Sequence, residues 1–416
     1  MSTTVLTGKR IILGVSGSIA AYKAADLASK LTQAGAIVET ILTPDAARFV
    51  GPLTFQSVTG HPAYTEADLW GAQAHVLHIG LAQRADLIVV APATAQTMAR
   101  LAHGFADNLL SLTALAATCP LLVAPAMDGD MFAHPTTQAN LRLLQERGVI
   151  VIGPEEGHLA SGLVARGRMT EPEHLLGQIR YHLSRSGPLR QRRIIVTAGG
   201  TREPVDPVRV LTNRSSGRQG TALAQAALDA GADVTLIATP VEVPIPVGVE
   251  LVPVQTAAEM ADAVQAACPG SDALLMAAAV SDFRPSQPAE QKLKKEDGTP
   301  TLVLEPTPDI LAAVAAQRRE TGCPRVVVGF AAETEHLIQN ARSKLRSKGM
   351  DLIVANDVTA ADSGFSVDTN RVVLLDTWGE TEPLPLLSKS EVARRVIERV
   401  GGLLSAKGDP AVDQTQ

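Results

Sequence analysis

Short apolar runs rich in β-branched residues recur along this chain, and they constrain its fold more than any other feature. Each run ends in small residues and is followed by a stretch with helical spacing, as Lys9–Gly14 is followed by Ile19–Gln33. Apolar runs without polar alternation are typical of parallel strands that are buried on both faces. Their alternation with helices predicts an α/β protein built on doubly wound parallel sheets.

Two such series are present. The first has expected strands at Ala36–Thr43, Ala85–Val90, Leu121–Pro125 and Val149–Ile152, and the second at Ile194–Val196, Asp233–Ala238, Leu274–Ala279, Arg325–Val328 and Leu352–Ala355. Between them, Ser184–Arg193 (SRSGPLRQRR) is polar and breaks both periodicities, which indicates a linker. A chain of 416 residues has room for two large domains. We therefore predict domains at 1–190 and 191–405 and a disordered tail at 406–416.

Composition narrows the class of function. The net charge is −6 and no long basic run is present, so neither a nucleic acid nor an anionic membrane surface is an expected partner. Cys119, Cys268 and Cys323 lack C-x-x-C spacing, which argues against a zinc site and favours a reducing compartment. No leader or membrane-spanning stretch is apparent, so we expect a cytoplasmic protein that acts on small molecules.

Loops at the carboxyl ends of the strands are the expected binding regions, because doubly wound sheets bind ligands there. Gly14–Ser18 follows the first strand, and Ala91–Thr94 forms an expected tight turn that a flat ring could approach. Gly199 and Gly200 would let the backbone approach a ligand. Asn213–Gly220 precedes a helix and suits an anion, although an ordinary capped helix is the alternative. Asp282–Pro300, rich in Pro, Gln and charge, is an expected mobile flap, called the flap below.

The stretch Ile194–Gly220, IIVTAGGTREPVDPVRVLTNRSSGRQG, closely resembles the opening of phosphopantothenate–cysteine ligase. The resemblance extends over nearly the whole chain to the bifunctional coenzyme A biosynthesis family. It implies a flavodoxin-like or Rossmann-like flavoprotein in the first half, which acts as a phosphopantothenoylcysteine decarboxylase, and a Rossmann-like ligase domain in the second.

The first half contains three candidate flavin-binding segments. Gly14–Lys23 (GVSGSIAAYK), Ala91–Thr94 and Ala106–Leu110 resemble segments of the flavin-containing cysteine decarboxylases. The resemblance implies that FMN is held by Ser16, Gly17, Ser18, Thr43, Ala91, Pro92, Ala93 and Thr94. His78 matches the family's catalytic histidine, whereas a lone histidine is otherwise usually a hydrogen-bonded core or surface residue.

Two positions depart from the family's decarboxylase pattern. Asp128 stands where the family has a substrate-binding asparagine, and Ser161 where it has a proton-donating cysteine. An ionised Asp128 would repel a substrate carboxylate by about 4 kcal/mol at 4 Å in a medium of dielectric 20. Asp128 could instead be protonated and serve as the acid, because a buried carboxyl near another carboxylate has a raised pKa. The alternative is a flavin-binding half that serves as an assembly scaffold.

The second half contains the residues that match the ligase. Asn213 matches the residue that handles the acyl-cytidylate, and Lys292 matches the flap lysine of acyl-nucleotide formation, although a lysine run is more often a solvated face. Phe330 matches a residue near the base, and Lys344 and Lys348 match triphosphate contacts on one helix face. The implied nucleotide site consists of Met276, Ala277, Ala278, Asp282, Lys292, Thr307, Pro308, Asp309, Ile310, Leu311, Phe330, Lys344 and Lys348.

Together these matches imply two reactions. The first is CTP-dependent ligation of 4′-phosphopantothenate with cysteine, and the second is FMN-dependent decarboxylation of the product to 4′-phosphopantetheine. Mg²⁺ is implied with the triphosphate, without assigned ligands. The resemblance also implies a homo-oligomer with trimeric flavin domains and dimeric ligase domains.

Overall fold

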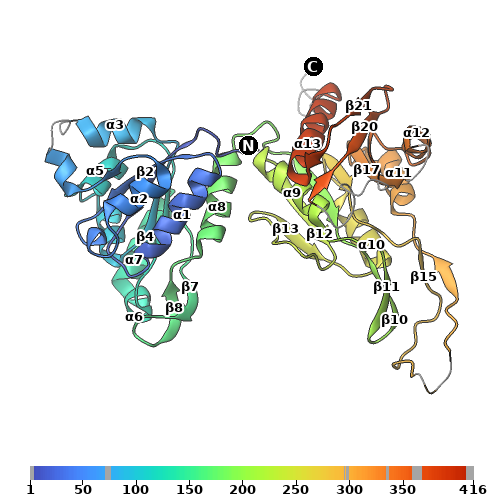
Figure 1. The fold of residues 1–416 in the computed structure, drawn as a ribbon, viewed down its shortest axis with the longest axis horizontal. Helices are drawn as coiled ribbons and strands as arrows, with labels where there is room; N and C mark the ends of the chain where they lie inside the picture. The colour runs from blue at the N-terminus through green and yellow to red at the C-terminus, as the bar shows by residue number, and fades with distance from the viewer. Residues whose placement is uncertain are drawn as a thin grey trace. The chain divides into compact units, whose positions relative to one another are not determined.

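The structure is a computed structural model, and it describes residues 4–70, 76–294, 296, 299–333, 337–357 and 368–408. The chain divides into two compact units, of which the first ends at Leu183 and the second begins at Ser184 (Figure 1). Each unit is described by itself.

The first unit is a parallel sheet covered by helices on both faces. Its strands are β1 Arg10–Val15, β2 Ile37–Leu42, β3 Ala63–Tyr64, β4 Leu87–Ala93, β5 Leu121–Pro125, β6 Ile150–Val151, β7 Glu155–His158 and β8 Val164–Arg168. Its helices are α1 Ala21–Gln33, α2 Pro52–Thr59, α3 Leu77–Arg84, α4 Ala95–His103, α5 Leu109–Ala116, α6 Gly129–Ala133, α7 Pro135–Glu146 and α8 Pro172–Ser184, with short 3₁₀ turns at Ala46–Arg48 and Glu66–Trp70.

The strand order is β3-β2-β1-β4-β5-β6, and neighbouring strands are parallel. Successive β1 side chains enter two cores, because side chains alternate along a strand. Ile11 and Leu13 pack with Leu27 of α1, whereas Ile12 packs with Leu81 of α3 and Met98 of α4. The order reverses between β1 and β4, which is the switch point where doubly wound sheets bind ligands.

The second unit repeats this plan. Its strands are β9 Arg193–Ala198, β10 Arg202–Asp206, β11 Arg209–Thr212, β12 Asp233–Ala238, β13 Glu250–Pro253, β14 Ala273–Met276, β15 Phe283–Pro285, β16 Leu304–Pro306, β17 Val326–Glu333, β18 Leu352–Asp357, β19 Thr369–Asn370, β20 Val372–Asp376, β21 Thr381–Pro383 and β22 Leu387–Ser388. Its helices are α9 Arg218–Asp229, α10 Ala257–Ala267, α11 Ile310–Thr321, α12 Leu337–Ser347 and α13 Lys389–Ala406.

The large sheet of this unit has the order β13-β12-β9-β14-β17-β18-β20-β21. Its first six strands are parallel and follow the same pattern of reversal, here between β9 and β14, while β20 and β21 join antiparallel. The prediction of two doubly wound α/β units is thus confirmed. Two antiparallel pairs, β10–β11 and β15–β16, extend from the unit (Figure 1).

Several local predictions were wrong. Ala91–Ala93 belongs to β4 and is not a turn, with a register shift against β5 between Val90 and Ala93. The segment after residue 153, for which no strand was predicted, contains the β7–β8 hairpin. The flap begins in the β15–β16 pair, whose Arg284 and Glu305 side chains form an ion pair of 2.8 Å.

The segment Ser184–Arg193 is not a free linker. Leu189 is 4% exposed and its N–H donates to the carbonyl of Ala230 at 2.7 Å. Arg185 pairs with Asp233 at 2.9 Å. The predicted boundary at 190/191 therefore falls within the second compact unit. At the other end, α13 reaches Ala406 and Lys407 contacts Asp351, so the expected tail is too long; residues 409–416 lie outside the described residues.

Candidate functional site

The first candidate site lies at the switch point of the first unit. The Ser16 hydroxyl donates to the carbonyl of Pro92 at 2.7 Å and accepts the N–H of Thr94 at 3.0 Å. This pair of bonds ties the loop after β1 to the end of β4, so Ser16 is 1% exposed. Ser16, which the sequence analysis predicted as an FMN contact, therefore holds the two expected cofactor loops together.

The loop after β1 packs closely against the segment that follows β2. A Cβ atom at Gly17 would collide with Cβ of Asp45, so only glycine fits there. Thr43 accepts the N–H of Ala46, and Thr94 caps α4 by accepting the N–H of Thr97. Gly17 therefore lets this loop pack against Asp45, and the N-terminus of α1 beside the loop suits an anionic group.

His78 lies on α3, and its Nδ1 atom is buried without a hydrogen-bond partner. Among the described residues it forms no hydrogen bond with the predicted FMN contacts. A buried nitrogen without a partner is unusual in a folded protein and is compatible with a ligand that supplies the partner.

Asp128 and Ser161 meet in the structure. The Ser161 hydroxyl donates to the Asp128 carboxylate at 2.5 Å, and the N–H of Asp130 donates to the other carboxylate oxygen at 3.1 Å. These two hydrogen bonds, that of Ser161 first, lower the pKa of Asp128 below its ordinary value. This direction is opposite to the one required if Asp128 is to be a protonated acid in the free protein.

The β7–β8 hairpin places Ser161 against Asp128. The N–H of Met127 donates to the carbonyl of Gly167 at 3.0 Å, and a Cβ atom on Gly129 would lie 2.6 Å from that of Ala165. Sequence reasoning identified both chemical positions but not the hairpin, because Glu155–His158 is too polar to be recognised as a strand.

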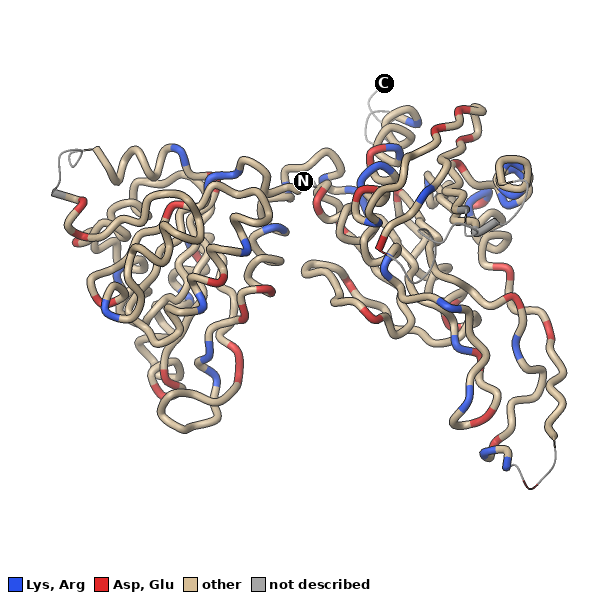
Figure 2. The backbone as a smooth tube through the Cα atoms, viewed as in Figure 1, with Lys and Arg blue, Asp and Glu red and all other residues tan. Residues whose placement is uncertain are grey.

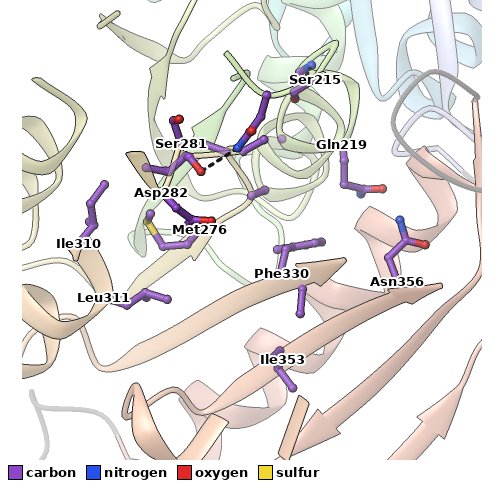
Figure 3. A pocket seen from close by; sticks show the side chains of 18 of the residues that line it. Ser215, Gln219, Met276, Ser281, Asp282, Ile310, Leu311, Phe330, Ile353 and Asn356 are labelled. Carbon is purple, nitrogen blue, oxygen red and sulfur yellow. Dashed lines mark hydrogen bonds between the residues drawn. The ribbon is translucent and has the colours of Figure 1, made fainter. Parts of the chain in front are cut away.

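The second candidate site is a cavity of about 700 Å³ in the second unit. It opens beside the β9–β14 switch point, where doubly wound sheets bind ligands. Of the predicted nucleotide residues, all but Lys292 line it, and so does Asn213. Figure 3 shows Met276, Asp282, Ile310 and Leu311 on one side of Phe330, and Gln219 and Asn356 on the other.

The cavity wall near Asp282 is held by hydrogen bonds between segments that are distant in sequence. The Asn213 amide donates to the carbonyl of Val280 at 2.9 Å. The Thr307 hydroxyl donates to the carbonyl of Ser281 at 2.6 Å, and the Thr307 N–H donates to the carbonyl of Asp282 at 3.0 Å. The Thr307 residue thus fixes the loop before α11 against the segment after β14.

Cationic groups reach the cavity from three helices and from the turn after one of them. Lys344 comes from α12 and Lys348 from the turn directly after it, Arg218 from α9 and Lys389 from α13. Lys348 forms an ion pair with Asp309. Burial raises the pKa of Asp309, but the Lys348 ammonium and the N–H of Ala312 outweigh it, so the pKa lies below its ordinary value. Burial and the nearby Arg218 charge lower the pKa of Lys389.

Arg218 and Gln219 line the cavity from the predicted Asn213–Gly220 segment, whereas Asn356, Asn370 and Lys389 were missed from the sequence. Asn356 directly follows the buried strand residues Leu352–Ala355, which is the same signal that identified Asp282. Lys389 follows Ser388, the first residue of a capping box with Glu391, and this marks a helix start. Both signals are present in the sequence, but the sequence does not show that these residues line the same cavity.

Two predicted features do not reach the cavity. Gly199 and Gly200 are absent from its lining; a Cβ atom on Gly199 would collide with Thr239, and one on Gly200 would lie 2.7 Å from the carbonyl of Asn213. These glycines therefore allow close packing within the protein. Lys292 is exposed on the flap and is likewise absent from the lining.

Comparison with known proteins decides the family. The model described as "Flavoprotein" matches residues 1–184, and the one described as "DNA/pantothenate metabolism flavoprotein C-terminal domain" matches residues 189–403. The coenzyme A biosynthesis bifunctional protein CoaBC of Bacillus subtilis is 44% identical over 408 residues, which cover 97% of this chain and 100% of that protein. This chain belongs to the bifunctional coenzyme A biosynthesis family. The prediction of a bifunctional ligase and decarboxylase is confirmed.

A further relative and two solved structures are similar to this chain. CoaBC of Mycobacterium bovis is 45% identical over 404 residues, covering 94% of this chain and 96% of that protein. The solved C-terminal domain of a CoaBC protein is 36% identical with a TM-score of 0.45, covering 53% of this chain and 100% of that one. A PPC decarboxylase mutant complexed with pantothenoylaminoethenethiol is 35% identical with a TM-score of 0.40, covering 42% and 98%.

Two other features are absent from the residues that the structure describes. Within the described part of the chain, no helix is long and apolar enough to cross a membrane. Among those same residues, no group of three or more His, Cys, Asp or Glu side chains could hold a metal ion.

Proposed function

We propose that the cavity of the second unit joins 4′-phosphopantothenate to cysteine at the expense of CTP. The observation that carries this proposal is that one cavity collects Asn213, Asp282, Phe330 and the two lysines of α12 and the turn after it from separate loops, strands and a helix. An aromatic ring beside polar groups and several cations suits a nucleoside triphosphate.

The reaction has two steps. A carboxylate oxygen of phosphopantothenate attacks the α-phosphorus of CTP, and the bond to the β-phosphate breaks to release pyrophosphate. The cysteine amine then attacks the acyl carbon, CMP leaves and the amine proton passes to solvent. Lys344, Lys348 and Arg218 would balance the phosphate charge, and Lys348 would exchange Asp309 for a phosphate oxygen. Mg²⁺ would enter with the triphosphate, which supplies oxygen ligands that it prefers.

In the first unit, we propose that FMN lies against the Ser16–Ser18 loop and the Ala91–Thr94 segment. FMN, when bound there, would supply the two-electron chemistry that makes loss of the cysteine carboxylate feasible. Ser16 would hold the two loops together, and Gly17 would let the loop after β1 lie close to Asp45. His78 would orient the substrate. Asp128 and Ser161 would face the substrate from the hairpin side.

An isotope experiment tests the ligase proposal. Phosphopantothenate labelled with ¹⁸O in its carboxylate is incubated with CTP, Mg²⁺, cysteine and the full-length protein. The acyl-cytidylate route requires one ¹⁸O atom in the CMP that is released, because the carboxylate oxygen remains on phosphorus. Unlabelled CMP, or CDP in place of CMP, would refute this route.

The assembly and compartment stay predictions. We propose a homo-oligomer, with trimeric flavin domains and dimeric ligase domains, located in the cytoplasm. Analytical ultracentrifugation of the whole protein and of the second unit alone would test the two oligomeric states.

A further inference from the structure

The flap is fastened to the β10–β11 hairpin on both sides of Lys292. On one side, the N–H of Ala289 donates to the carbonyl of Val205 at 3.0 Å. On the other, the N–H of Leu293 donates to the Asp206 carboxylate at 3.2 Å, and Arg209 donates to the carbonyl of Leu293 at 2.7 Å. Both backbone polar groups of Leu293 are therefore bound by one hairpin. We call Asp206 and Arg209 the Leu293 socket.

The Asp206 carboxylate is buried and is surrounded by backbone N–H donors. Its side chain is 0% exposed, and one carboxylate oxygen also accepts the N–H groups of Val208 and Arg209 at 2.9 and 2.8 Å. Burial raises the pKa of Asp206, but the three N–H donors outweigh it and leave the pKa below its ordinary value. A buried carboxylate with three N–H donors holds its partners firmly. The Asp206 carboxylate therefore binds both the turn of the hairpin and the flap.

Lys292 directly precedes Leu293, so the socket determines where this lysine lies. In the socketed arrangement Lys292 is exposed and absent from the cavity lining. Figure 2 shows the basic residues of the flap beside the charged tip of the hairpin. A lysine that is to meet phosphate in the cavity must leave this position, and it cannot do so freely while Leu293 is bound at both its N–H and its carbonyl.

We propose that Asp206 is a positioning residue, which holds Lys292 off the cavity until nucleotide binds. This inference rests on the proposed ligase function and adds a resting state to it. The bound nucleotide draws Lys292 to its phosphates, the Leu293 bonds break, and the flap returns to the socket when products leave. The apparent affinity for CTP is lowered by the fraction of protein in the socketed state.

Two variants break the same bond from opposite sides. Asp206→Asn retains an oxygen for Val208 and Arg209 but turns an NH₂ group toward the N–H of Leu293. Leu293→Pro removes that N–H and leaves the hairpin unchanged. Gln291→Pro is the control, since it places the same ring in the flap at an N–H with no hydrogen bond among the described residues.

Steady-state ligation supplies the first readout. Asp206→Asn and Leu293→Pro should each lower the KM for CTP about three- to tenfold, the scale of one lost hydrogen bond to a charged group. The kcat should not fall, and the double variant should go no further than either single one. Gln291→Pro should keep the parental KM. A parental KM in both variants, or a lower kcat at unchanged KM, would overturn the proposal.

Hydrogen exchange of the full-length protein supplies a readout that needs neither turnover nor a stable variant. The Leu293 amide should exchange slowly without nucleotide, and at least about tenfold faster when CTP and phosphopantothenate are added without cysteine. Fast exchange in the free protein, or no response to the substrates, would overturn the socket. Failure of the parent to form CMP would instead refute the proposed ligase, so the two failures are distinguishable.

Discussion

Asp128 and Ser161 depart together from the expected decarboxylase residues, and the structure places them in one hydrogen bond. The bond lowers the pKa of Asp128, so its carboxyl is ionised at neutral pH in the free protein. A lowered pKa also means that the contact contributes stability above the ordinary carboxyl pKa, and that this contribution is lost as pH falls through the folded-state value. The pair therefore presents negative charge where a substrate carboxylate is expected.

Asp128→Asn should lower the KM for phosphopantothenoylcysteine at least about tenfold, because it removes repulsion between two carboxylates. The parental KM should be flat between pH 6 and 8, since Asp128 stays ionised across that range. Steady-state decarboxylation at several pH values measures both. An unchanged KM in the variant, or a parental KM that falls steeply toward pH 6, would contradict an ionised Asp128.

Lys292→Gln should slow ligation by about 10²-fold or more, which is the scale expected when a charge that stabilises the transition state is removed. FMN absorbance of the purified protein should be unchanged, because the flap lies in the other unit. Lys294→Gln provides a matched control, since it neutralises an exposed lysine of the same flap. Parental ligation by Lys292→Gln, measured as CMP release, would remove Lys292 from the mechanism.

Of the residues predicted for the nucleotide site, all but Lys292 line the cavity of the second unit, because sequence motifs preserve residue types at strand ends, as with Asp282 and Phe330. It could not predict that Leu293 is bound by Asp206, because that contact depends on two hairpins meeting in space. The roles of Gly199 and Gly200 were wrong for a similar reason. A glycine can admit a ligand or a neighbouring segment of the protein, and the local sequence does not distinguish them.

At the scale of elements, helix α9 contributes Arg218 and Gln219 to the cavity lining and packs directly on β9. A Cβ atom on Gly220 would lie 2.6 Å from Cβ of Ala198 and 2.7 Å from the carbonyl of Thr197. The sequence pattern predicted this strand and this helix but not the close contact between them. Strand ends such as Ala91–Ala93 were misplaced because proline and alanine suggest a turn, whereas the sheet incorporates them through a register shift.

Gly220→Ala should destabilise the second unit by about 1–3 kcal/mol, because the added methyl group would push α9 away from the sheet. The same change should raise the KM for CTP, since Arg218 and Gln219 would move with the helix. Gly402→Ala in α13 is the control, because its Cβ would meet no atom within 4 Å and should be neutral or stabilising. Urea denaturation of both variants would test this; equal stabilities would contradict the close packing.

At the scale of the whole molecule, two sheets with the same strand reversal each carry one candidate site at their switch point. The repeated alternation of strands and helices predicted this plan. The extent of each unit was less predictable, because the polar segment Ser184–Arg193 resembles a linker in composition. Only the folded structure shows Leu189 bound to Ala230 and Arg185 to Asp233.

A fragment of residues 184–416 should therefore fold and ligate alone. A fragment of residues 194–416 should be less stable, because it lacks the Leu189 and Arg185 contacts. Thermal unfolding and CMP release from both fragments measure the difference. Equal stability would show that the segment is a spacer after all, and inactivity of the longer fragment would contradict an independent ligase unit.

The most direct test of the whole account is mass spectrometry of the products that the full-length protein makes from phosphopantothenate, cysteine, CTP and Mg²⁺. The account predicts CMP and phosphopantothenoylcysteine first, and then 4′-phosphopantetheine as the FMN-loaded first unit removes carbon dioxide. Phosphopantothenoylcysteine that accumulates without decarboxylation would support a scaffold role for the first unit. The absence of both CMP and phosphopantothenoylcysteine would contradict the central claim.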